Sequence, residues 1–524
     1  MSRIRMESLM TGEKFIRSLL ILAVLAVAGC ARAPAHNGTT LVIGQGGDAV
    51  SLDPAVSVGS GDGTIMALCY ERLTAIDPAS ADGAAVGELA RAWEVSPDGL
   101  TWTFHLKEGH RFLSDRPVAA ADVAASFERV GKVGRAPSEG LFWMKSVQAI
   151  DPATVRFTLN FPFPALPKVL TLTSGSVVDA AAAKQHAVDG DSGQAWLGEH
   201  CEGSGPYAVK AWQRGQRITL IANPNASTQP AYFKTVEFKI VPEASSRRIE
   251  LDKGDLDLIS GLGAAEVERY AALKDVALES SSASNSLSYL TLNTTRGVLA
   301  DVRVRQAIAR AIDYNALRDD VLRGQATTPT GLIPARAPGF DPSKPTPTRD
   351  VAAAKALLAA AGHPQGIDLT MVVSQPGPVS ELIQADLADA GIRLRLQRMS
   401  PAALDAARTN GDFDLLYDGW IMDFPDPFIF LNLVFPSPAD GGAGNFSHYS
   451  NPKVDQLLQT AMTTADPVRR AALYDQAQDM IMADQPIVML FSPKLVMAHR
   501  RSVTDVKVDP YQPNYLNIAA MTRN

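Results

Sequence analysis

Short segments in which hydrophobic and polar residues alternate recur along the chain, and this period of two is typical of half-buried β-strands. Most of them lie between residues 100 and 300. The predicted strands cover residues 101–106, 154–159, 217–221, 235–241, 287–292 and 393–396. The sequence Ser-Pro-Asp-Gly at residues 96–99 separates the first of them from an earlier strand-like run, which predicts a β-hairpin.

Helical patterns lie between and after these strands, and they begin at residues that cap helices well. Apolar residues recur every four positions after Asp301, and an alanine- and leucine-rich run follows Asp350. Asn451 and Asp466 each precede a proline, which is favoured at the first helical position. The mixture of strands and helices predicts an α/β protein whose C-terminal third is rich in helix.

A proline-rich segment interrupts this pattern. Residues 328–350 contain six prolines and therefore form little regular structure. Because a helix is predicted on each side, two interpretations stay open: a linker between domains, or a surface loop within one domain.

The chain has 524 residues, more than the roughly 250–300 at which single cores stop growing, so two or three core regions are expected. Its composition, with 46% hydrophobic and 20% charged residues, is that of a globular protein. The formal net charge of −7 provides no positive field for a phosphate backbone. Nucleic acid is therefore excluded as the main partner.

The N-terminus has the features of an export signal. Basic residues precede an apolar run at residues 19–28, which is too short to span a bilayer because about 20 residues are needed. The sequence Val-Ala-Gly-Cys at residues 27–30 resembles a bacterial lipobox, so we expect a lipoprotein signal peptide at residues 1–29, acylation of Cys30, and a tether at residues 30–40. A plain signal peptide with an incidental cysteine is the alternative. No second apolar run of about 20 residues occurs, so the lipid is the only expected attachment to the membrane.

Two cysteines remain, Cys69 and Cys201. In an oxidising compartment they can form one disulfide, and two separate buried thiols are the alternative that the sequence leaves open. The local motifs of nucleotide-binding loops, zinc proteases, redox dithiols and hydrolase elbows do not occur, and the eight histidines are scattered. We therefore expect no enzyme activity, no metal site and no cofactor.

Five segments occur in an order that resembles the family 5 extracellular solute-binding proteins, which include the dipeptide- and oligopeptide-binding components of ABC importers. Residues 88–106 read ELARAWEVSPDGLTWTFHL, and residues 412–427 read DFDLLYDGWIMDFPDP. The other segments lie at residues 203–207, 292–313 and 449–452. The resemblance extends over most of the chain after the tether.

The resemblance implies an α/β, two-lobed clamshell, the periplasmic-binding-protein-like fold of type II and of the large cluster C kind, with an inserted β-rich domain. Lobe I would be discontinuous and comprise residues 41–76, 201–290 and 495–524. The inserted domain would cover residues 77–200, and lobe II residues 291–494. A ligand would be enclosed where the lobes meet, with crossing strands as the hinge.

The resemblance also implies a function. The protein would be the lipid-anchored, monomeric binding component of an ABC importer, exported to the periplasm or cell surface, which captures oligopeptides and delivers them to the permease subunits. One alternative is a non-peptide solute in the same fold, such as a nickel chelate, haem, glutathione or a sugar conjugate. Another is an envelope or signalling lipoprotein that keeps the clamshell.

In peptide-binding members that this chain resembles, an Asp three positions after a Trp receives the α-ammonium of the peptide, and that position is Asp423 here. An ammonium group removed from water needs a paired carboxylate, and a loop-capping role is the alternative for Asp423. Asp426 precedes a proline and is expected to be structural. Trp420 is expected to wall a side-chain pocket, with a core aromatic as the alternative. Gly419 and Tyr417 belong to the same ligand-contacting strand end, where main-chain hydrogen bonds can hold a peptide.

On the other lobe, Asp48 and Ala49 align with the family's first strand and loop, which can border the cleft. A short-peptide binder also needs a cation for the peptide's carboxylate. Residues 375–378, where some dipeptide binders carry Arg, have none. The sequence therefore favours longer peptides, or another solute, over dipeptides.

Overall fold

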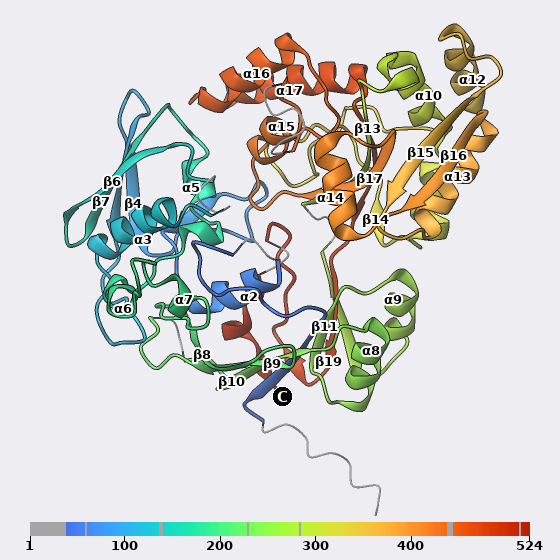
Figure 1. Ribbon diagram of the computed structural model, residues 1–524. Helices are drawn as coiled ribbons and strands as arrows, with labels where there is room; N and C mark the ends of the chain where they lie inside the picture. Colours follow the sequence, from blue (N-terminus) through green and yellow to red (C-terminus); the bar gives the residue numbers. More distant parts are fainter. Residues whose placement is uncertain are drawn as a thin grey trace, which may run out of the picture.

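Two large β-sheets, each covered by helices, and a smaller four-stranded sheet make up the computed structural model (Figure 1). The structure describes residues 38–57, 60–135, 140–227, 230–281, 285–437, 444–512 and 515–524. The predicted signal peptide and Cys30 lie outside the described residues. Among the residues that are described, no helix is both long and apolar enough to cross a membrane.

The first large sheet has seven strands drawn from distant parts of the chain. Its central strand β1 is parallel to both neighbours, β10 and β11. The helices α8 (Ala244–Lys253) and α9 (Ala264–Ala271) pack on one face of it. In order across the sheet, the strands are β12 (Val276–Ser280), β19 (Val496–Arg500), β11 (Leu258–Ser260), β1 (Thr40–Gln45), β10 (Thr235–Ile240), β9 (Arg217–Ala222) and β8 (Tyr207–Gln213).

The second large sheet has six strands and lies between two layers of helices (Figure 1). Its strands, in order, are β14 (Ala326–Thr327), β18 (Ile487–Pro493), β13 (Ser286–Leu292), β17 (Leu415–Ile421), β15 (Ile367–Val373) and β16 (Ile392–Arg398). One layer contains α10 (Val302–Ala311), α12 (Val351–Ala360) and α13 (Pro378–Asp389). The other contains α15 (Phe428–Val434), α16 (Pro452–Thr463) and α17 (Pro467–Asp484). The helix α14 (Pro401–Asn410) precedes β17.

The small sheet is antiparallel and forms a separate β-rich unit with α3 (Ala120–Val133). An aromatic core joins the helix to the sheet, because the rings of Phe127 and Phe157 meet edge to face at 5.0 Å. Phe163 extends this contact to the second large sheet, with its ring centroid 5.2 Å from that of Phe428 on α15. The strands, in order, are β4 (Ala90–Val95), β5 (Thr101–Leu106), β7 (Thr154–Leu159) and β6 (Met144–Asp151).

The remaining helices and strands are short. They connect the large units and cover their edges. They are α2 (Ser60–Cys69), β2 (Thr74–Ile76), β3 (Ala85–Gly87), α5 (Leu166–Val169), α6 (Ala180–Gln185), α7 (Gln194–Leu197), α11 (Tyr314–Ala316), β20 (Val503–Thr504) and β21 (Thr522–Arg523).

The chain passes between the two large sheets at two neighbouring segments. One leads from β12 to β13, and the other from β18 to β19. The amide of Ser281 in the first donates to the carbonyl oxygen of Leu495 in the second, at 3.0 Å. Two crossing segments that lie side by side form the kind of hinge about which two lobes can rotate.

Most elements predicted from periodicity are confirmed. The segments at 101–106 and 154–159 are β5 and β7, and Asp301, Asp350 and Asp466 each accept an amide at the start of a helix. The proline-rich segment is a loop within one unit, because β14 before it and α12 after it both belong to the six-stranded sheet and its helices.

One predicted boundary needs correction. The change from lobe I to lobe II was expected after residue 290, yet β13 already begins at Ser286 and pairs with β17 and β18. The boundary falls inside a strand because periodicity identifies a strand but not the sheet that it joins.

Cys69 and Cys201 are joined by a disulfide, with their Cα atoms 5.8 Å apart. Both residues are buried in the core beside the seven-stranded sheet. The bond links the end of α2 to the segment that enters β8, across 132 positions of sequence. It therefore closes the loop that contains the whole four-stranded unit.

Loss of this disulfide is expected to destabilise the protein. In the chain-entropy model, closing a loop of this length lowers the entropy of the unfolded chain, which raises the free energy of unfolding by about 4–5 kcal/mol. The variant Cys69→Ala/Cys201→Ala should show a correspondingly lower free energy of unfolding in urea titrations. Reductant should lower the stability of the parent protein toward that of the variant and leave the variant unchanged. Equal stability of the parent with and without reductant would contradict the expectation.

Candidate ligand-binding site

The predicted site lies at the C-terminal end of β17, in the middle of the six-stranded sheet. β17 pairs antiparallel with β13, so that Trp420 lies opposite Leu287 and Gly419 opposite Ser288. A Cβ atom on Gly419 would come within 2.8 Å of the carbonyl oxygen of Leu287. Glycine is therefore required here, because the neighbouring strand approaches too closely for a side chain.

The alternation of β17 separates two of the predicted residues. Tyr417 packs against the core formed with α10 and α13, and burial raises the pKa of its hydroxyl. Trp420 points to the other face of the sheet, with its ring centroid 6.3 Å from that of Phe430 on α15. Successive side chains of a strand face opposite sides, so residues 417 and 420 do not form one surface.

The indole N–H of Trp420 is buried and has no hydrogen-bond partner among the described residues. A buried donor without a partner costs about 1–3 kcal/mol, and such groups are rare in folded proteins. The core residues Trp102 and Trp143 share this feature, so the orphan donor alone does not decide between a pocket wall and a core aromatic. It is available to a ligand that reaches the end of β17.

The loop after β17 is fixed by a buried ion pair. Asp426 is 3% exposed, and its two oxygens accept from the guanidinium of Arg470 on α17 at 2.7 and 2.8 Å. Asp426 also accepts the amide of Phe428 at 3.0 Å, which starts α15. Burial alone would lower the pKa of Arg470, but the Asp426 carboxylate outweighs it and raises the pKa. The expected structural role of Asp426 matches these contacts.

Two further contacts hold the loop on either side of Asp423. Before it, the Met422 amide donates to the carbonyl oxygen of Asn285 at 2.9 Å, and the Asn285 side chain donates to the Met422 carbonyl oxygen at 3.1 Å. After it, Lys168 on α5 donates to the Pro425 carbonyl oxygen at 2.8 Å. The backbone that carries Asp423 is therefore bound by a crossing segment and by the inserted unit.

Asp423 itself is left without a partner. The structure records no hydrogen bond or ion pair from its carboxylate to any described residue, and solvent reaches its side chain. Even so, the surrounding protein removes enough water to raise the pKa of the carboxyl to about 6. A carboxylate that is accessible, unpaired and poorly solvated is suited to receiving a cation from outside the protein.

Asp423 faces the C-terminal segment of the chain. Burial raises the pKa of the Tyr515 hydroxyl, and the Asp423 carboxylate contributes to this increase while Arg72 opposes it. The guanidinium of Arg72 lies 5.1 Å from the centre of the Tyr515 ring and pairs with Glu88 at 3.1 Å. Tyr515, with Arg72 over its ring, thus faces Asp423 from the side opposite β17.

Other acids near the strand end already have partners. Asp418 accepts from Arg408 on α14 at 2.9 Å, and this guanidinium also lies over the ring of Phe446. Burial raises the pKa of Asp418, and Arg408 lowers it in part. Of the two neighbouring acids, Asp418 is neutralised within the protein and Asp423 is not.

Asp48 and Ala49 follow β1 and contact the turn between β8 and β9, in the seven-stranded sheet. The Asp48 carboxylate accepts from the Trp212 indole at 2.9 Å and from the Gly215 amide at 2.7 Å. Ala49 is buried, and its carbonyl oxygen accepts from Arg214 at 3.3 Å. The recorded bonds of these residues thus fix the turn, and none of them joins the Asp423 loop. Their contact with ligand stays a prediction.

Sequence reasoning missed several residues that shape the site. Asn285 and Lys168 carry no motif and act through backbone carbonyl groups. Arg72 and Tyr515 are 443 positions apart and meet only through the fold. The described residues contain no group of three or more His, Cys, Asp or Glu side chains that could hold a metal ion.

Comparison with known proteins identifies the family. The model of the bacterial extracellular solute-binding proteins, family 5, matches residues 84–442, which is more than half of the chain. The chain belongs to this family. Its members bind solutes outside the cytoplasm rather than transform them.

Individual relatives agree with this result. The chain is 33% identical to the probable D,D-dipeptide-binding periplasmic protein DdpA of Escherichia coli K12, over 92% of this chain and 94% of that protein. It is 30% identical to the dipeptide-binding protein of the same strain, over 80% and 83% of the two chains. Among solved structures, the periplasmic binding protein DppA of Helicobacter pylori, in complex with the peptide STSA, superimposes with a TM-score of 0.79 at 27% identity. That match covers 92% of this chain and 98% of the other.

The raised pKa of Asp423 can be tested without any ligand. Carbon-detected NMR of aspartate-labelled protein should show one carboxyl that titrates near pH 6, about two units above an ordinary aspartate, and this signal should be missing from Asp423→Asn. Asp405→Asn is the control, since it removes an exposed acid on α14 and leaves the loop after β17 unchanged. A midpoint near 4 for Asp423 would show that its carboxyl is well solvated, against the expectation.

Proposed function

We propose that this protein is the extracytoplasmic binding component of an ABC importer, and that it captures short peptides by their free α-ammonium group. The observation that carries the proposal is the unpaired carboxylate of Asp423 at the end of β17, with its pKa raised by burial. A carboxylate held in this way gains most from a cation that arrives with the ligand, because both charges then lose water together.

Two features beside Asp423 suit the main chain of a peptide. The Trp420 indole N–H is a buried donor without a partner among the described residues, and Gly419 is exposed at the end of the strand. Hydrogen bonds to the main chain hold a peptide whatever its side chains are, which is what a general peptide importer requires. The relatives named for dipeptides and the solved complex with STSA support a peptide as cargo.

We propose that the two large sheets form the two lobes and that the crossing segments at Ser281 and Leu495 are the hinge. The seven-stranded sheet belongs to lobe I, the six-stranded sheet to lobe II, and the four-stranded unit is the inserted domain. Contacts such as Lys168 with Pro425 and Arg336 with the Ser80 carbonyl oxygen join opposite sides of the cleft. Closure over a peptide would strengthen these contacts and present one surface to the permease subunits. One chain supplies both lobes and the cleft, so a monomer is sufficient.

Peptide binding is expected to depend on a free N-terminus. Protein that has been unfolded and refolded to remove carried-over ligand should melt a degree or more higher with di- to pentapeptides at 100 times the dissociation constant, where binding contributes about 2.7 kcal/mol. Forms of the same peptides that are both N-acetylated and C-terminally amidated should give a much smaller shift. Asp423→Asn should weaken binding by about 2 kcal/mol or more, roughly thirtyfold, because it leaves the ammonium unpaired. No shift with any free peptide would exclude peptides as cargo.

The affinity for peptides is also expected to depend on pH. The free protein holds a proton on Asp423 below about pH 6, whereas the ammonium of the ligand requires the ionised form. The dissociation constant should therefore be constant above pH 7 and rise up to about tenfold per unit as the pH falls below 6. Calorimetry at pH 7.5, 6 and 5 measures this, and Asp423→Asn should show no such slope. A flat profile for the parent protein would exclude Asp423 as the ammonium partner.

We further propose that the chain is anchored to a membrane by a lipid on Cys30, after removal of residues 1–29. The support is the sequence at residues 27–30, which resembles a lipobox. Cells grown with a clickable fatty acid should label the parent protein and not Cys30→Ser. The variant should also move from the membrane fraction to the soluble fraction, because a lipid anchor supplies the membrane affinity. Equal labelling of the two proteins would exclude Cys30 as the lipid site.

A further inference from the structure

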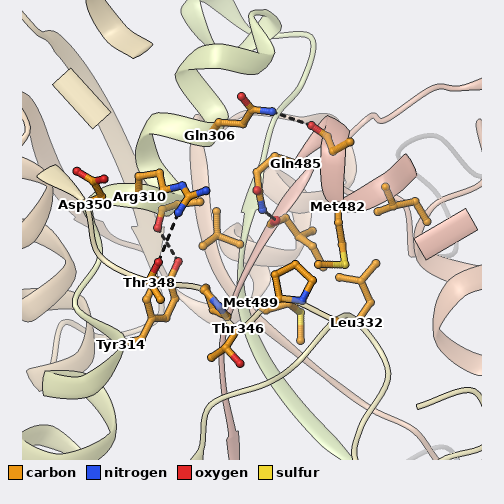
Figure 2. A pocket seen from close by; sticks show the side chains of 18 of the residues that line it. Gln306, Arg310, Tyr314, Leu332, Thr346, Thr348, Asp350, Met482, Gln485 and Met489 are labelled. Carbon is orange, nitrogen blue, oxygen red and sulfur yellow. Dashed lines mark hydrogen bonds between the residues drawn. The ribbon is translucent and has the colours of Figure 1, made fainter. Parts of the chain in front are cut away.

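A second hollow lies within the six-stranded unit, apart from the Asp423 loop. It has a volume of about 900 Å³, within the range of ligand-binding pockets, and none of its lining residues belongs to the loop (Figure 2). The start of β18 forms one side. The walls are mostly apolar and come from α10 and α12 on one side and from the end of α17 on the other, with residues 345–348 closing the remaining side. We call this space the β18 cavity.

The β18 cavity lies against an open edge of the sheet. β14 pairs only with Ser492 and Pro493 at the far end of β18, so no described strand pairs with the outer edge from Ile487 to Met489. The chain does pass beside this edge at residues 345–348, with the sequence Pro-Thr-Pro-Thr. Two of these four residues lack an N–H group, so the segment is poorly suited to pair as a strand.

The backbone of β18 directs hydrogen-bonding groups into this space. Leu292 donates its amide to the Pro486 carbonyl oxygen, and Leu290 lies opposite Val488, so residues 486 and 488 bond to β13. Because amide directions alternate along an antiparallel strand, Ile487 and Met489 direct their N–H and C=O groups to the open edge. One of these groups is occupied by the protein itself.

That occupied group is the carbonyl oxygen of Ile487. It accepts from the side-chain amide of Gln485 at 2.6 Å (Figure 2). The bond is local, between residues two positions apart, and a side-chain rotation is enough to release it. Gln485 thus fills the position that the N–H group of an added strand would take.

The cavity continues the layered architecture of the sheet. The side chains of Ile487 and Met489 belong to the core shared with α17, whereas Val488 belongs to the core shared with α10 and α12. Both helical layers extend past β18, with Met482 on one side of the cavity and Leu357 on the other. The space therefore lies where one more strand of the sheet would lie beside β18. Its apolar walls could contact the side chains of such a strand, which point alternately to the two helical layers.

A free cation lies at the rim of the same cavity. Arg310 is exposed, and the hydrogen bond recorded for its guanidinium is a long one, 3.4 Å to the Thr348 hydroxyl. Among the described residues, no carboxylate forms an ion pair with it. Arg310 can therefore receive a carboxylate from a ligand in the β18 cavity.

We propose that the β18 cavity is a second peptide-binding site, which takes a short, extended, apolar peptide as an added strand on the edge of β18, with its terminal carboxylate on Arg310. Main-chain hydrogen bonds to Ile487 and Met489 would hold the peptide, as in other cases of strand addition to a sheet edge. Three residues of β18 form the open edge, so the match is to a peptide of about three residues. The site differs from the cleft because it needs the peptide's carboxylate and main chain, not its ammonium group.

The test uses peptides that Asp423 does not recognise. Acetyl-Ala-Val-Ala with a free carboxylate lacks the ammonium group, and its binding to the exported chain carrying Asp423→Asn is measured by calorimetry at pH 7. We expect the acetylated peptide to bind. Its affinity should be at least tenfold weaker when the central amide is N-methylated, because this removes a main-chain donor. Amidation of the C-terminus should also weaken binding at least tenfold in this chain, and this difference should disappear in Arg310→Gln.

A pair of variants on α12 controls for the place of binding. Ala353 lines the cavity, and Ala353→Trp should fill it and abolish binding. Ala352 is the adjacent, exposed residue that does not line the cavity, so Ala352→Trp should bind like the parent. Hydrogen exchange provides a further readout, since the bound peptide should slow exchange of the Ile487 and Met489 amides.

Three results would each overturn the proposal. They are no binding of the acetylated peptide at millimolar concentration, equal binding of the N-methylated peptide, and equal loss of binding in Ala352→Trp and Ala353→Trp. Equal binding of the N-methylated form would identify the cavity as a plain apolar pocket without strand addition. Because the acetylated peptide cannot use Asp423, a failure here leaves the proposed cleft function intact. Conversely, a failure of free peptides to bind the cleft leaves this site untouched.

Discussion

The buried ion pair between Asp426 and Arg470 is the interaction on which the candidate site depends. Two parallel hydrogen bonds at 2.7 and 2.8 Å join the loop after β17 to α17, and both partners are almost fully removed from water. Removing one member of such a pair leaves an uncompensated charge and costs about 3–5 kcal/mol. The rigidity matters because the side chain of Asp423 forms no recorded bond within the described part of the chain. Its position is set by its neighbours in sequence, Met422 and Pro425, and by the ion pair one residue further on.

The acids around β17 differ in what satisfies their charge. Asp418 is paired with Arg408 and Asp426 with Arg470, so each is already neutralised by the protein. Asp423 lies between them in sequence and has no partner among the described residues, and burial raises its pKa. A site that stores one unsatisfied charge favours a ligand that brings the opposite one, since the protein then gains an interaction that it lacks when empty. Under the proposed function, selectivity for a cationic end group would follow from this contrast more than from the shape of the cleft.

The sequence predicts local structure well here because local structure depends on local patterns. The strand at 154–159 and the helix after Asp301 are specified by periodicity and by a cap, and both occur as expected. Asp423 was predicted as a ligand contact from a motif that is contiguous in sequence. The partners that define its surroundings were not found, since Arg72, Lys168 and Tyr515 reach the loop only after four separate parts of the chain have folded together. The boundary near residue 290 failed for the same reason, because pairing partners decide which sheet a strand joins.

The proline-rich loop illustrates how one sequence feature can have two physical consequences. Its prolines prevent residues 345–348 from completing the sheet, and they also cover the edge of β18 with chain that cannot extend it. A bare edge of this kind would invite pairing with another copy of the protein, whereas an edge enclosed by two helical layers admits only a short segment. In the absence of a ligand, the Gln485 side chain donates to one carbonyl oxygen of this edge. The cost is only the entropy lost when one side chain is fixed in a single rotamer. The same arrangement that protects the sheet from aggregation therefore leaves a peptide-sized position open.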